Sequence, residues 1–225
     1  MGPELVRLDQ DARRHHRPPA QQARGRRGGG ARGRDPRRRL PPRDRHPRLT
    51  TSPVLLRAYV VDDAPRVLDT LGRPEVVRWL GSPVPMADLA AAHEWIESKR
   101  RREEADPFDL ARAIVVRETG LVAGTVSLSR CHRRDTGEFV GEYEVGWTLH
   151  PDSTGHGHAT EAARLLLDDV FARGLPEVWC GVFVGNEASC RVAERLGLPL
   201  VGVGPDPWWD GDSHLYRVSR EEWLT

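Results

Sequence analysis

The chain contains 225 residues with 34 basic and 33 acidic side chains, which gives a formal net charge of +1, and 38% of its residues are hydrophobic. This length allows one full domain and an additional segment. No apolar run approaches the roughly 18 residues that suggest a membrane-spanning helix, and the N-terminus lacks the apolar core of a secretory signal. Cys131, Cys180 and Cys190 are odd in number and share no metal-ligand spacing, which predicts reduced thiols. We therefore expect a cytoplasmic protein with no membrane partner.

Residues 1–50 differ in composition from the rest of the chain. They hold 15 arginines against 5 acidic residues, a local charge of +10, which leaves −9 for residues 51–225. Few large apolar side chains are present, so this arginine-, glycine- and proline-rich tail is predicted to be disordered. It is either a basic arm that grips nucleic-acid phosphates or the translation of a leader upstream of the true start. The second interpretation is favoured, and nucleic acid is not an expected partner.

From residue 53 to residue 225 the pattern is that of one folded domain. Its first part predicts, in order, a strand, three helices and a two-stranded hairpin, over residues 54–59, 62–71, 74–80, 87–104, 113–116 and 121–128. Asp62 is the expected N-cap of the first helix, with Pro65 in its first turn. The third helix is expected to place Leu89, Ala92 and Ile96 on one face.

The second part of the domain predicts a β-α-β unit followed by a helix and two strands. These elements cover residues 143–149, 160–173, 178–184, 188–196, 200–203 and 215–218. The apolar run 178–184 is expected to be buried on both faces and to lie parallel to strand 143–149, because a helix connects the two. The predicted fold class is therefore α/β, with a mixed sheet that is mostly antiparallel and contains one parallel unit.

Two glycines lie between strand 143–149 and the helix that follows it. The first amides of a helix have no internal acceptor, and the helix dipole favours an anion at this end. Gly155 and Gly157 can adopt positive φ and carry no Cβ, so the backbone can curl around a phosphate. A dinucleotide-binding loop would need a third small residue where Thr160 stands, and no Gly-Lys-Ser/Thr sequence of a Walker loop occurs. The stretch therefore predicts a different diphosphate loop.

Three blocks of sequence, in the same order, resemble the GNAT superfamily of acyl-CoA-dependent N-acetyltransferases, and in particular its RimJ/RimL-type branch. The blocks are Leu56-Arg57 with residues 74–80, residues 144–162, and residues 186–197. Thr154 stands where the superfamily has Gln or Arg, and His156 and His158 stand where the branch commonly has Lys or Arg and Tyr.

The resemblance implies a GNAT fold with splayed central strands, acetyl-CoA as co-substrate and no metal. It implies direct acetyl transfer, in a ternary complex, to a primary amine of a small molecule or a protein N-terminus, by a monomer or homodimer. The pantetheine arm would lie between strands 143–149 and 178–184, and the thioester carbonyl would accept a backbone N–H near residues 145–147. The residues expected to bind acetyl-CoA are Val145, Trp147, Leu149, Thr154, Gly155, His156, Gly157, His158, Ala159, Thr160 and Asn186.

Two residues are candidates for acid–base catalysis. Glu144, beside the expected acetyl position, is the candidate base that takes a proton from the ammonium, and Glu142 is the second candidate. Ser189 matches the position where the branch often has a proton donor for the departing thiolate. Glu144 could instead be an ordinary strand carboxylate, and Ser189 could cap its helix.

Further side chains could serve more than one role. His150, His156 and His158 could form a metal cluster, although their spacing is mixed and no Cys accompanies them. The turn at residues 208–212, with Asp206, could attract a cationic amine or be a solvated hairpin tip. Trp79, Trp95 and Trp179 are expected in the core.

Two functions of another class also remain at this stage. The unusual residues of the glycine loop would suit a non-catalytic acyl-CoA-binding or regulatory module. The basic tail would suit a protein that binds the ribosome or another nucleic acid.

Overall fold

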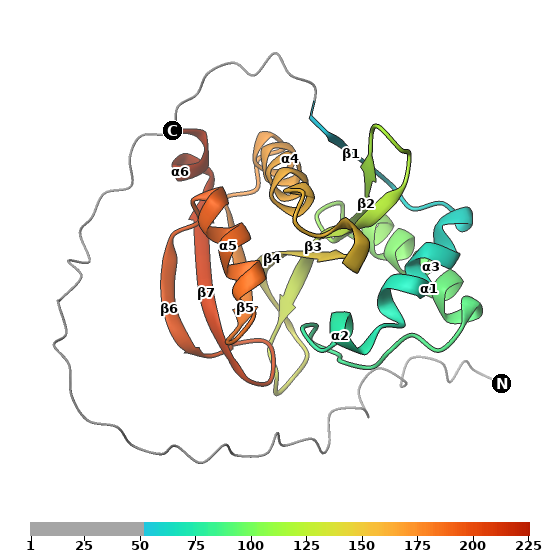
Figure 1. Ribbon diagram of the computed structural model, residues 1–225. Coiled ribbons are helices and arrows are strands. Elements are labelled where there is room, and N and C mark those ends of the chain that lie inside the picture. Colours follow the sequence, from blue (N-terminus) through green and yellow to red (C-terminus); the bar gives the residue numbers. More distant parts are fainter. Residues whose placement is uncertain (1–51) are drawn as a thin grey trace, which may run out of the picture. The chain divides into compact units, whose positions relative to one another are not determined.

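The computed structural model describes residues 52–225, so the prediction of a disordered tail over residues 1–50 falls outside the described residues. In chain order the elements (Figure 1) are β1 (Val54–Arg57), η2 (Val61–Asp63), α1 (Ala64–Leu71), α2 (Pro74–Val77), α3 (Leu89–Ala105), β2 (Leu110–Val116), β3 (Val122–His132), β4 (Phe139–Leu149), η3 (Pro151–Ser153), α4 (His158–Ala172), β5 (Glu177–Phe183), α5 (Glu187–Leu196), β6 (Leu200–Pro205), β7 (Asp212–Ser219) and α6 (Arg220–Leu224). Within residues 52–225, none of the helices combines the length and apolarity that a membrane span requires.

The seven strands form one mixed sheet in the order β1-β2-β3-β4-β5-β7-β6. All neighbouring pairs are antiparallel except β4 and β5, which are parallel. This arrangement confirms the predicted fold class and the parallel β-α-β unit. Glu144 and Trp179 form the one register pair between β4 and β5, so the two strands separate on either side of it. From Val145 onward, the edge of β4 that faces β5 therefore has no strand partner, whereas its other edge pairs with β3.

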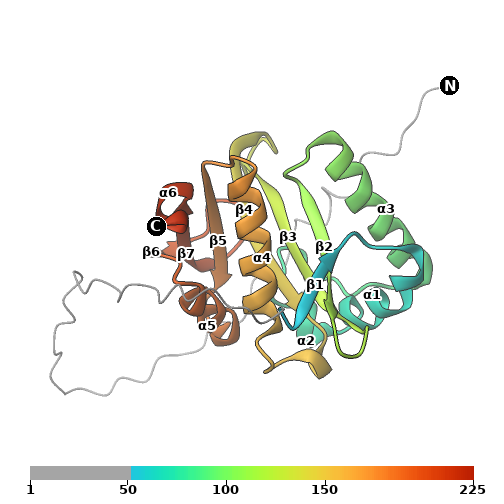
Figure 2. The same ribbon diagram turned by 90° about the horizontal axis from the view of Figure 1, so that it is seen from above.

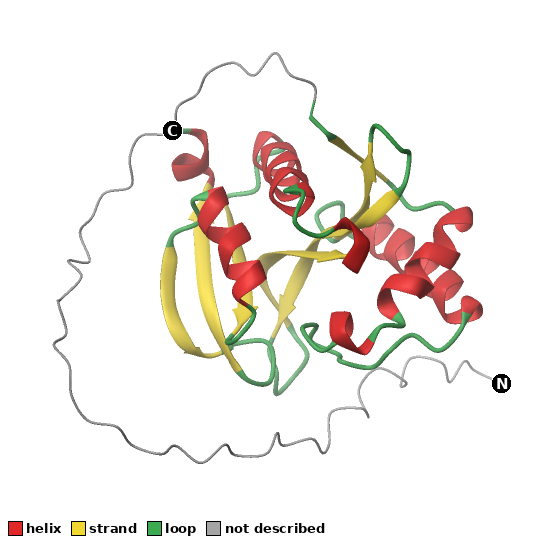
Figure 3. Cartoon of the chain, viewed as in Figure 1, coloured by secondary structure: helices red, strands yellow, loops and turns green. Residues whose placement is uncertain are grey.

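Helices cover both faces of the sheet. On one face, α4 lies across the middle of the sheet (Figure 2) and packs against β1 to β4, while α5 packs beside it on β5. On β2, Ile114 belongs to the main core under α4, whereas its neighbours Ala113 and Val115 belong to a separate cluster that includes Tyr59. Successive residues of a strand point to opposite faces. Tyr59 also packs on the cluster formed by α1 and α3, the separate helix group in Figure 3, which therefore covers the other face.

The predicted buried stripe of α4 is confirmed, because Ala163, Leu166, Leu167, Val170 and Phe171 are all at most 2% exposed. The expectation for β5 was wrong in one respect. Its burial alternates along the strand, with alternate residues only half-buried, so it is not buried on both faces.

The helices α1 and α3 begin differently from the predictions. Asp62 lies inside η2, and the N-cap of α1 is Asp63, whose carboxylate binds Arg57 and the Val60 backbone instead of the helix. In α3, Ala92 and Ile96 are buried but Leu89 is 42% exposed, because it is the first residue of the helix and lies beyond the core.

Helix α6 was not predicted. Its signal is a capping box, in which Ser219 Oγ accepts from the Glu222 backbone N–H and the Glu222 carboxylate accepts from the Ser219 N–H. The Ser-x-x-Glu spacing that encodes this reciprocal cap is visible in the sequence.

Candidate functional site

A cavity of about 740 Å³ opens where β4 and β5 separate. Its walls come from β3, β4, β5 and β7, from the start of α4, from α5, from α2 and the segment after it, and from the turn between β6 and β7. The predicted glycine loop and both candidate catalytic residues, Glu144 and Ser189, line this one cavity. Residues that the sequence assigned to one site are therefore brought together by the fold.

The glycine loop has the geometry predicted for an anion site. Gly155 and Gly157 have φ of 83° and 79°, in the left-handed region that favours glycine. A Cβ on either residue would point into open space, so the loop leaves room for a ligand against the backbone. Gly157 is the N-cap of α4, with no side chain capping the helix, and α4 begins at His158, two residues earlier than predicted. The first amides of α4 are therefore free to bind an anion.

Two buried polar atoms at this helix start lack partners. They are His158 Nδ1 and Thr160 Oγ1, and both residues line the cavity. Burial, with a smaller contribution from His156, lowers the pKa of His158, so this side chain is neutral near pH 7. Buried polar atoms are nearly always hydrogen-bonded in folded proteins. These two exceptions indicate a polar ligand at the start of α4.

Ten of the eleven residues predicted to bind acetyl-CoA line the cavity; these are Val145, Trp147, Leu149, Thr154, Gly155, Gly157, His158, Ala159, Thr160 and Asn186. His156 is outside the cavity lining. It is exposed and stacks on His158, with ring centroids 5.4 Å apart. The side chain of Thr154 turns back on its own loop, where Oγ1 donates to the Pro151 carbonyl at 2.9 Å.

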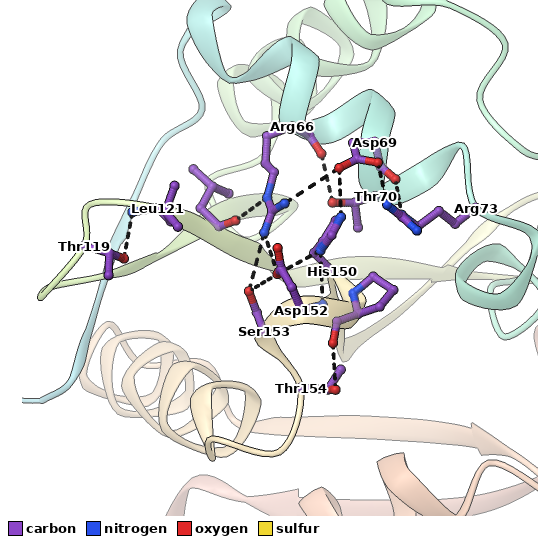
Figure 4. A network of polar contacts seen from close by, with 12 residues as sticks. Arg66, Asp69, Thr70, Arg73, Thr119, Leu121, His150, Asp152, Ser153 and Thr154 are labelled. Carbon is purple, nitrogen blue, oxygen red and sulfur yellow. Dashed lines mark hydrogen bonds and ion pairs between the residues drawn. The ribbon is translucent and has the colours of Figure 1, made fainter.

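A polar network fixes the loop to α1 (Figure 4). His150, which is 5% exposed, contacts Asp69 of α1 through Nε2 at 2.9 Å, and its Nδ1 accepts from the Asp152 backbone N–H at 3.2 Å. Arg66 of α1 donates to Asp152 Oδ1 at 2.7 Å and to the carbonyl of Val122 at 2.9 Å. The Arg66 hydrogen bond holds the pKa of Asp152 well below its usual range. His150 is therefore a structural anchor at the entrance to the glycine loop.

Glu144 combines a polar environment with a raised pKa. Its Oε1 accepts from the Gly181 backbone N–H at 2.9 Å, and its Oε2 accepts from Trp209 Nε1 at 3.1 Å. Burial raises the pKa of Glu144 to about 7, and the nearby charge of Asp206 acts in the same direction. A carboxyl group with such a pKa can accept and release a proton near neutral pH. Glu142 lies outside the cavity lining, so the structure favours Glu144.

Asn186 and Ser189 lie where β5 passes into α5. Asn186 is the N-cap, and its Oδ1 accepts from the Ser189 backbone N–H at 3.2 Å. The capping role that Ser189 could have had therefore belongs to Asn186. The Ser189 side chain lines the cavity instead, where its hydroxyl can donate a proton.

The turn between β6 and β7 closes over Glu144. Trp209 donates to Glu144 and also packs against Gly81, where a Cβ would overlap its indole ring. Two roles were predicted for this turn, attraction of a cationic amine and a solvated hairpin tip, and different residues of the turn suit each role. Asp206 is 2% exposed and lines the cavity, whereas Asp210 is exposed and pairs with Arg134.

Several cavity residues were not predicted from the sequence, namely Gly81, Gly181, Ser213, Arg191, Arg195 and Trp209 as a partner of Glu144. Arg191 and Arg195 carried a detectable signal, because they are one helical turn apart on α5, the helix that Asn186 caps. The remaining residues come from separate elements, and only the sheet order places them near Glu144.

The structure also decides the roles predicted for the histidines, tryptophans and cysteines. Among residues 52–225, no group of three or more His, Cys, Asp or Glu residues could hold a metal ion. Of the three tryptophans expected in the core, Trp95 is half-buried and packs on the cluster of α1 and α3, as predicted. Trp79 lines the cavity instead, and Trp179 is half-buried outside the core clusters. The three cysteines are free, as predicted, and the structure shows that all three are buried.

Comparison with known proteins gives concordant results. Residues 54–199 match the family model of the acetyltransferase (GNAT) domain. An uncharacterized N-acetyltransferase of Bacillus subtilis (strain 168), YnaD, is 23% identical over 182 residues, which cover 78% of this chain and 98% of that protein. The fold resembles spermidine N-acetyltransferase from Vibrio cholerae in complex with CoA and spermine, with a TM-score of 0.62, 16% identity, and coverage of 78% and 100%. It also resembles RimL, a ribosomal alpha-N-protein acetyltransferase in complex with coenzyme A, with a TM-score of 0.63, 16% identity, and coverage of 75% and 95%.

Proposed function

Because this chain belongs to the GNAT acetyltransferase family and is an N-acetyltransferase, we propose that its cavity binds acetyl-CoA and transfers the acetyl group directly to a primary amine. We assign this activity to a domain of residues 53–225 in the RimJ/RimL-type branch. Support for the branch comes from the three sequence blocks and from the similarity in fold to RimL. The free cysteines support a cytoplasmic protein.

The observation that carries the proposal is where the unpartnered polar atoms lie. Among the described residues, four buried side-chain atoms lack a hydrogen-bond partner, and all four belong to residues that line this cavity: His158, Thr160, Asp206 and Ser213. Unpaired buried polar atoms cost free energy, on the order of 1–3 kcal/mol each. Their concentration in one cavity is expected for a site whose ligands complete them.

The start of α4 fits the pyrophosphate of acetyl-CoA. The free amides from Gly155 to Thr160 would hold the phosphates, and the hydroxyl of Thr160 would donate to them. Positive charge would come from Arg191 and Arg195, since His158 is neutral. The pantetheine arm would lie along β4 beyond Val145, where the backbone has no strand partner. Asn186, the cap of α5, would orient that arm at the mouth of the splayed strands.

Glu144 would act as the base. The incoming ammonium must lose a proton before its nitrogen can attack, and a carboxylate with a pKa of about 7 can take that proton at neutral pH. The thioester supplies the acetyl group, so that the N–C bond forms as the C–S bond breaks. A backbone N–H from residues 145–147 would stabilise the negative charge on the carbonyl oxygen.

Ser189 would complete the proton transfer. Its hydroxyl donates a proton to the departing sulfur, which leaves with the electron pair of the C–S bond, and regains one as the amide nitrogen loses its second proton. Cys180 also lines the cavity, but burial raises the pKa of its thiol well above the usual value. A neutral thiol is a poor nucleophile, which favours direct transfer over an acyl-cysteine route.

Titration calorimetry of the full-length chain with acetyl-CoA tests the phosphate site. Gly157→Glu would place a negative side chain in the loop and should abolish binding. Gly120→Glu is the matched control, because Gly120 has a similar φ of 72°, has open space around it and lies in a hairpin turn outside the cavity lining.

Binding that Gly157→Glu abolishes and Gly120→Glu preserves would support the proposal. A screen of primary amines, including peptides with free N-termini, would then measure CoA release with a thiol reagent. Absence of acetyl-CoA binding by the wild-type chain would overturn the proposal. Binding without turnover of any amine would instead favour a non-catalytic module.

A further inference from the structure

One oxygen of the Asp206 carboxylate is buried without a partner. Asp206 follows β6, and its Oδ1 accepts from the backbone N–H groups of Trp208 and Trp209, at 2.9 Å each. Its Oδ2 has no hydrogen-bond partner, although the residue is only 2% exposed and lines the cavity. Buried carboxylate oxygens are almost always paired in folded proteins. Oδ1 of Asp206 therefore has a structural role, because it holds the turn. Oδ2 has no such role, which indicates that it binds a ligand.

Gly181 on β5 brings this oxygen close to Glu144. A Cβ on Gly181 would lie 2.8 Å from Glu144 Oε1 and 3.0 Å from Asp206 Oδ2. The two carboxylates therefore face the same side of β5, and a larger residue at this position would displace them. Ser213 on β7 lines the same cavity, is 1% exposed and has a hydroxyl oxygen without a partner.

We propose that Asp206, together with Ser213, binds the ammonium group of the acceptor amine and holds it beside Glu144. The inference rests on the proposed acetyltransferase function of the cavity. A primary ammonium carries three N–H donors, and Asp206 Oδ2 and Ser213 Oγ are acceptors that lack hydrogen-bond partners. Glu144 takes one proton from the bound group, and the freed nitrogen forms the N–C bond as the C–S bond breaks and sulfur keeps the electron pair.

The charges around the site define the chemical class of the acceptor. The acidic residues that line the cavity are Glu75, Glu144 and Asp206, from α2, β4 and the turn after β6. The basic and imidazole side chains that line it, among the described residues, are His158, Arg191 and Arg195, all on α4 and α5. A carboxylate next to the reacting amine would meet like charges at the acidic side. The acceptor is therefore an amine without a neighbouring carboxylate, such as an alkylamine or the N-terminus of a peptide, and not a free amino acid.

Asp206→Asn in the full-length protein tests this role directly. Asn keeps an oxygen that can accept from Trp208 and Trp209, but replaces the unpaired oxygen with an amide donor. Asp210→Asn is the matched control, because it removes one charge from the same turn at a residue that pairs with Arg134 outside the cavity lining. Two pairs of probes are compared in each protein, glycinamide with glycine and butylamine with norvaline, which is butylamine with a carboxylate on the carbon that carries the amine. Rates of CoA release give kcat and KM, and calorimetry gives the affinity for acetyl-CoA and the binding of each amine.

The wild-type protein should have a higher kcat/KM for the probe without a carboxylate in each pair. Asp206→Asn should raise the KM for that amine at least about tenfold, since it leaves a buried cation without its anion, and should reduce the preference within the pair. Acetyl-CoA affinity should not change, and Asp210→Asn should behave as wild type.

Three results would overturn the proposal: a wild-type KM in Asp206→Asn, equal use of the carboxylated probes by the wild-type protein, or acetyl-CoA binding without binding or turnover of any probe. The comparison within each pair needs no variant, so it decides the question even where Asp206→Asn does not fold. Absence of acetyl-CoA binding by the wild-type protein is a separate result, and it would overturn the proposed function itself.

Discussion

The two parts of the cavity are built in different ways. At the start of α4, the site consists mainly of backbone amides from one continuous stretch, residues 154–160, with two glycines in the left-handed region. Around Glu144, the site consists mainly of side chains from β4, β7 and the β6–β7 turn, and those of Glu144 and Asp206 meet over Gly181 of β5. The first part depends on local chain geometry, and the second depends on the tertiary fold.

The start of α4 and the surroundings of Glu144 should therefore tolerate different substitutions. The proposed phosphate site is made of amides and should tolerate changes of side chain, so we expect that Thr154, His156 and His158 can depart from the family pattern without removing it. The part around Glu144 relies mainly on individual side chains, so a substitution there removes the polar group itself. We therefore expect point substitutions to have their largest effects on catalysis beside Glu144, and smaller effects where arginines assist the backbone.

Glu144→Gln should produce the largest effect. Loss of the base should reduce kcat by roughly 10²–10⁴-fold, while acetyl-CoA affinity stays unchanged because the amides of α4 are intact. In the wild-type enzyme, kcat/KM should rise with pH and level off above about 7, where Glu144 is deprotonated. Steady-state rates over a pH series measure both effects.

Glu142→Gln is the matched control for this prediction. Glu142 is on the same strand but lies outside the cavity lining, so its loss should change kcat little. An equal loss of kcat in the two variants would mean that Glu144 has no special role as the base. The catalytic part of the cavity would then not be centred on Glu144.

The difference between locally encoded and tertiary parts of the cavity also explains which features could be predicted from the sequence. The order of elements, the parallel pair β4 and β5, and the loop at Gly155 and Gly157 follow from periodicity and glycine positions, which are local signals. Asp206 could be suggested only as part of an acidic turn, because its burial depends on β6 and β7 folding back beside β5. Pairing of Trp209 with Glu144 could not be predicted, since the two residues are 65 positions apart and meet through a turn with no regular pattern.

A second prediction concerns stability, because the fold raises the pKa of Glu144 to about 7. Between pH 4.5 and 7 the native state retains a proton that the unfolded chain releases, so the free energy of unfolding should fall as pH rises through this window. The change should be on the order of 1–3 kcal/mol, since one pKa unit corresponds to about 1.36 kcal/mol. Urea unfolding at several pH values measures it, and Glu144→Gln should have a flatter profile. A wild-type slope that persists in the variant would assign the effect to other groups.

Trp209→Phe should have a smaller effect, on the pH profile of catalysis. The indole N–H of Trp209 stabilises the charged form of Glu144, so its removal should raise the pKa of Glu144 further. The rise of kcat/KM should then move to higher pH, with little change on the plateau. Trp208→Phe is the control, because Trp208 makes an edge-to-face contact with Trp179 and lies outside the cavity lining. A shift to lower pH, or the same shift in both variants, would contradict the assignment of this hydrogen bond.

The smallest effect is expected at the two arginines of α5. Arg191 and Arg195 are exposed, so each should contribute only about 0.2–1 kcal/mol to phosphate binding, and the double alanine variant should weaken acetyl-CoA binding by roughly twofold to thirtyfold. The difference from wild type should shrink as salt is added, because exposed charges are screened, whereas the contribution of the amides should remain. Arg164→Ala on α4 is the control, since Arg164 pairs with Glu161 outside the cavity lining. Complete loss of binding in the double variant would mean that side chains, and not the backbone, carry the phosphate site, and the contrast between the two parts of the cavity would no longer hold.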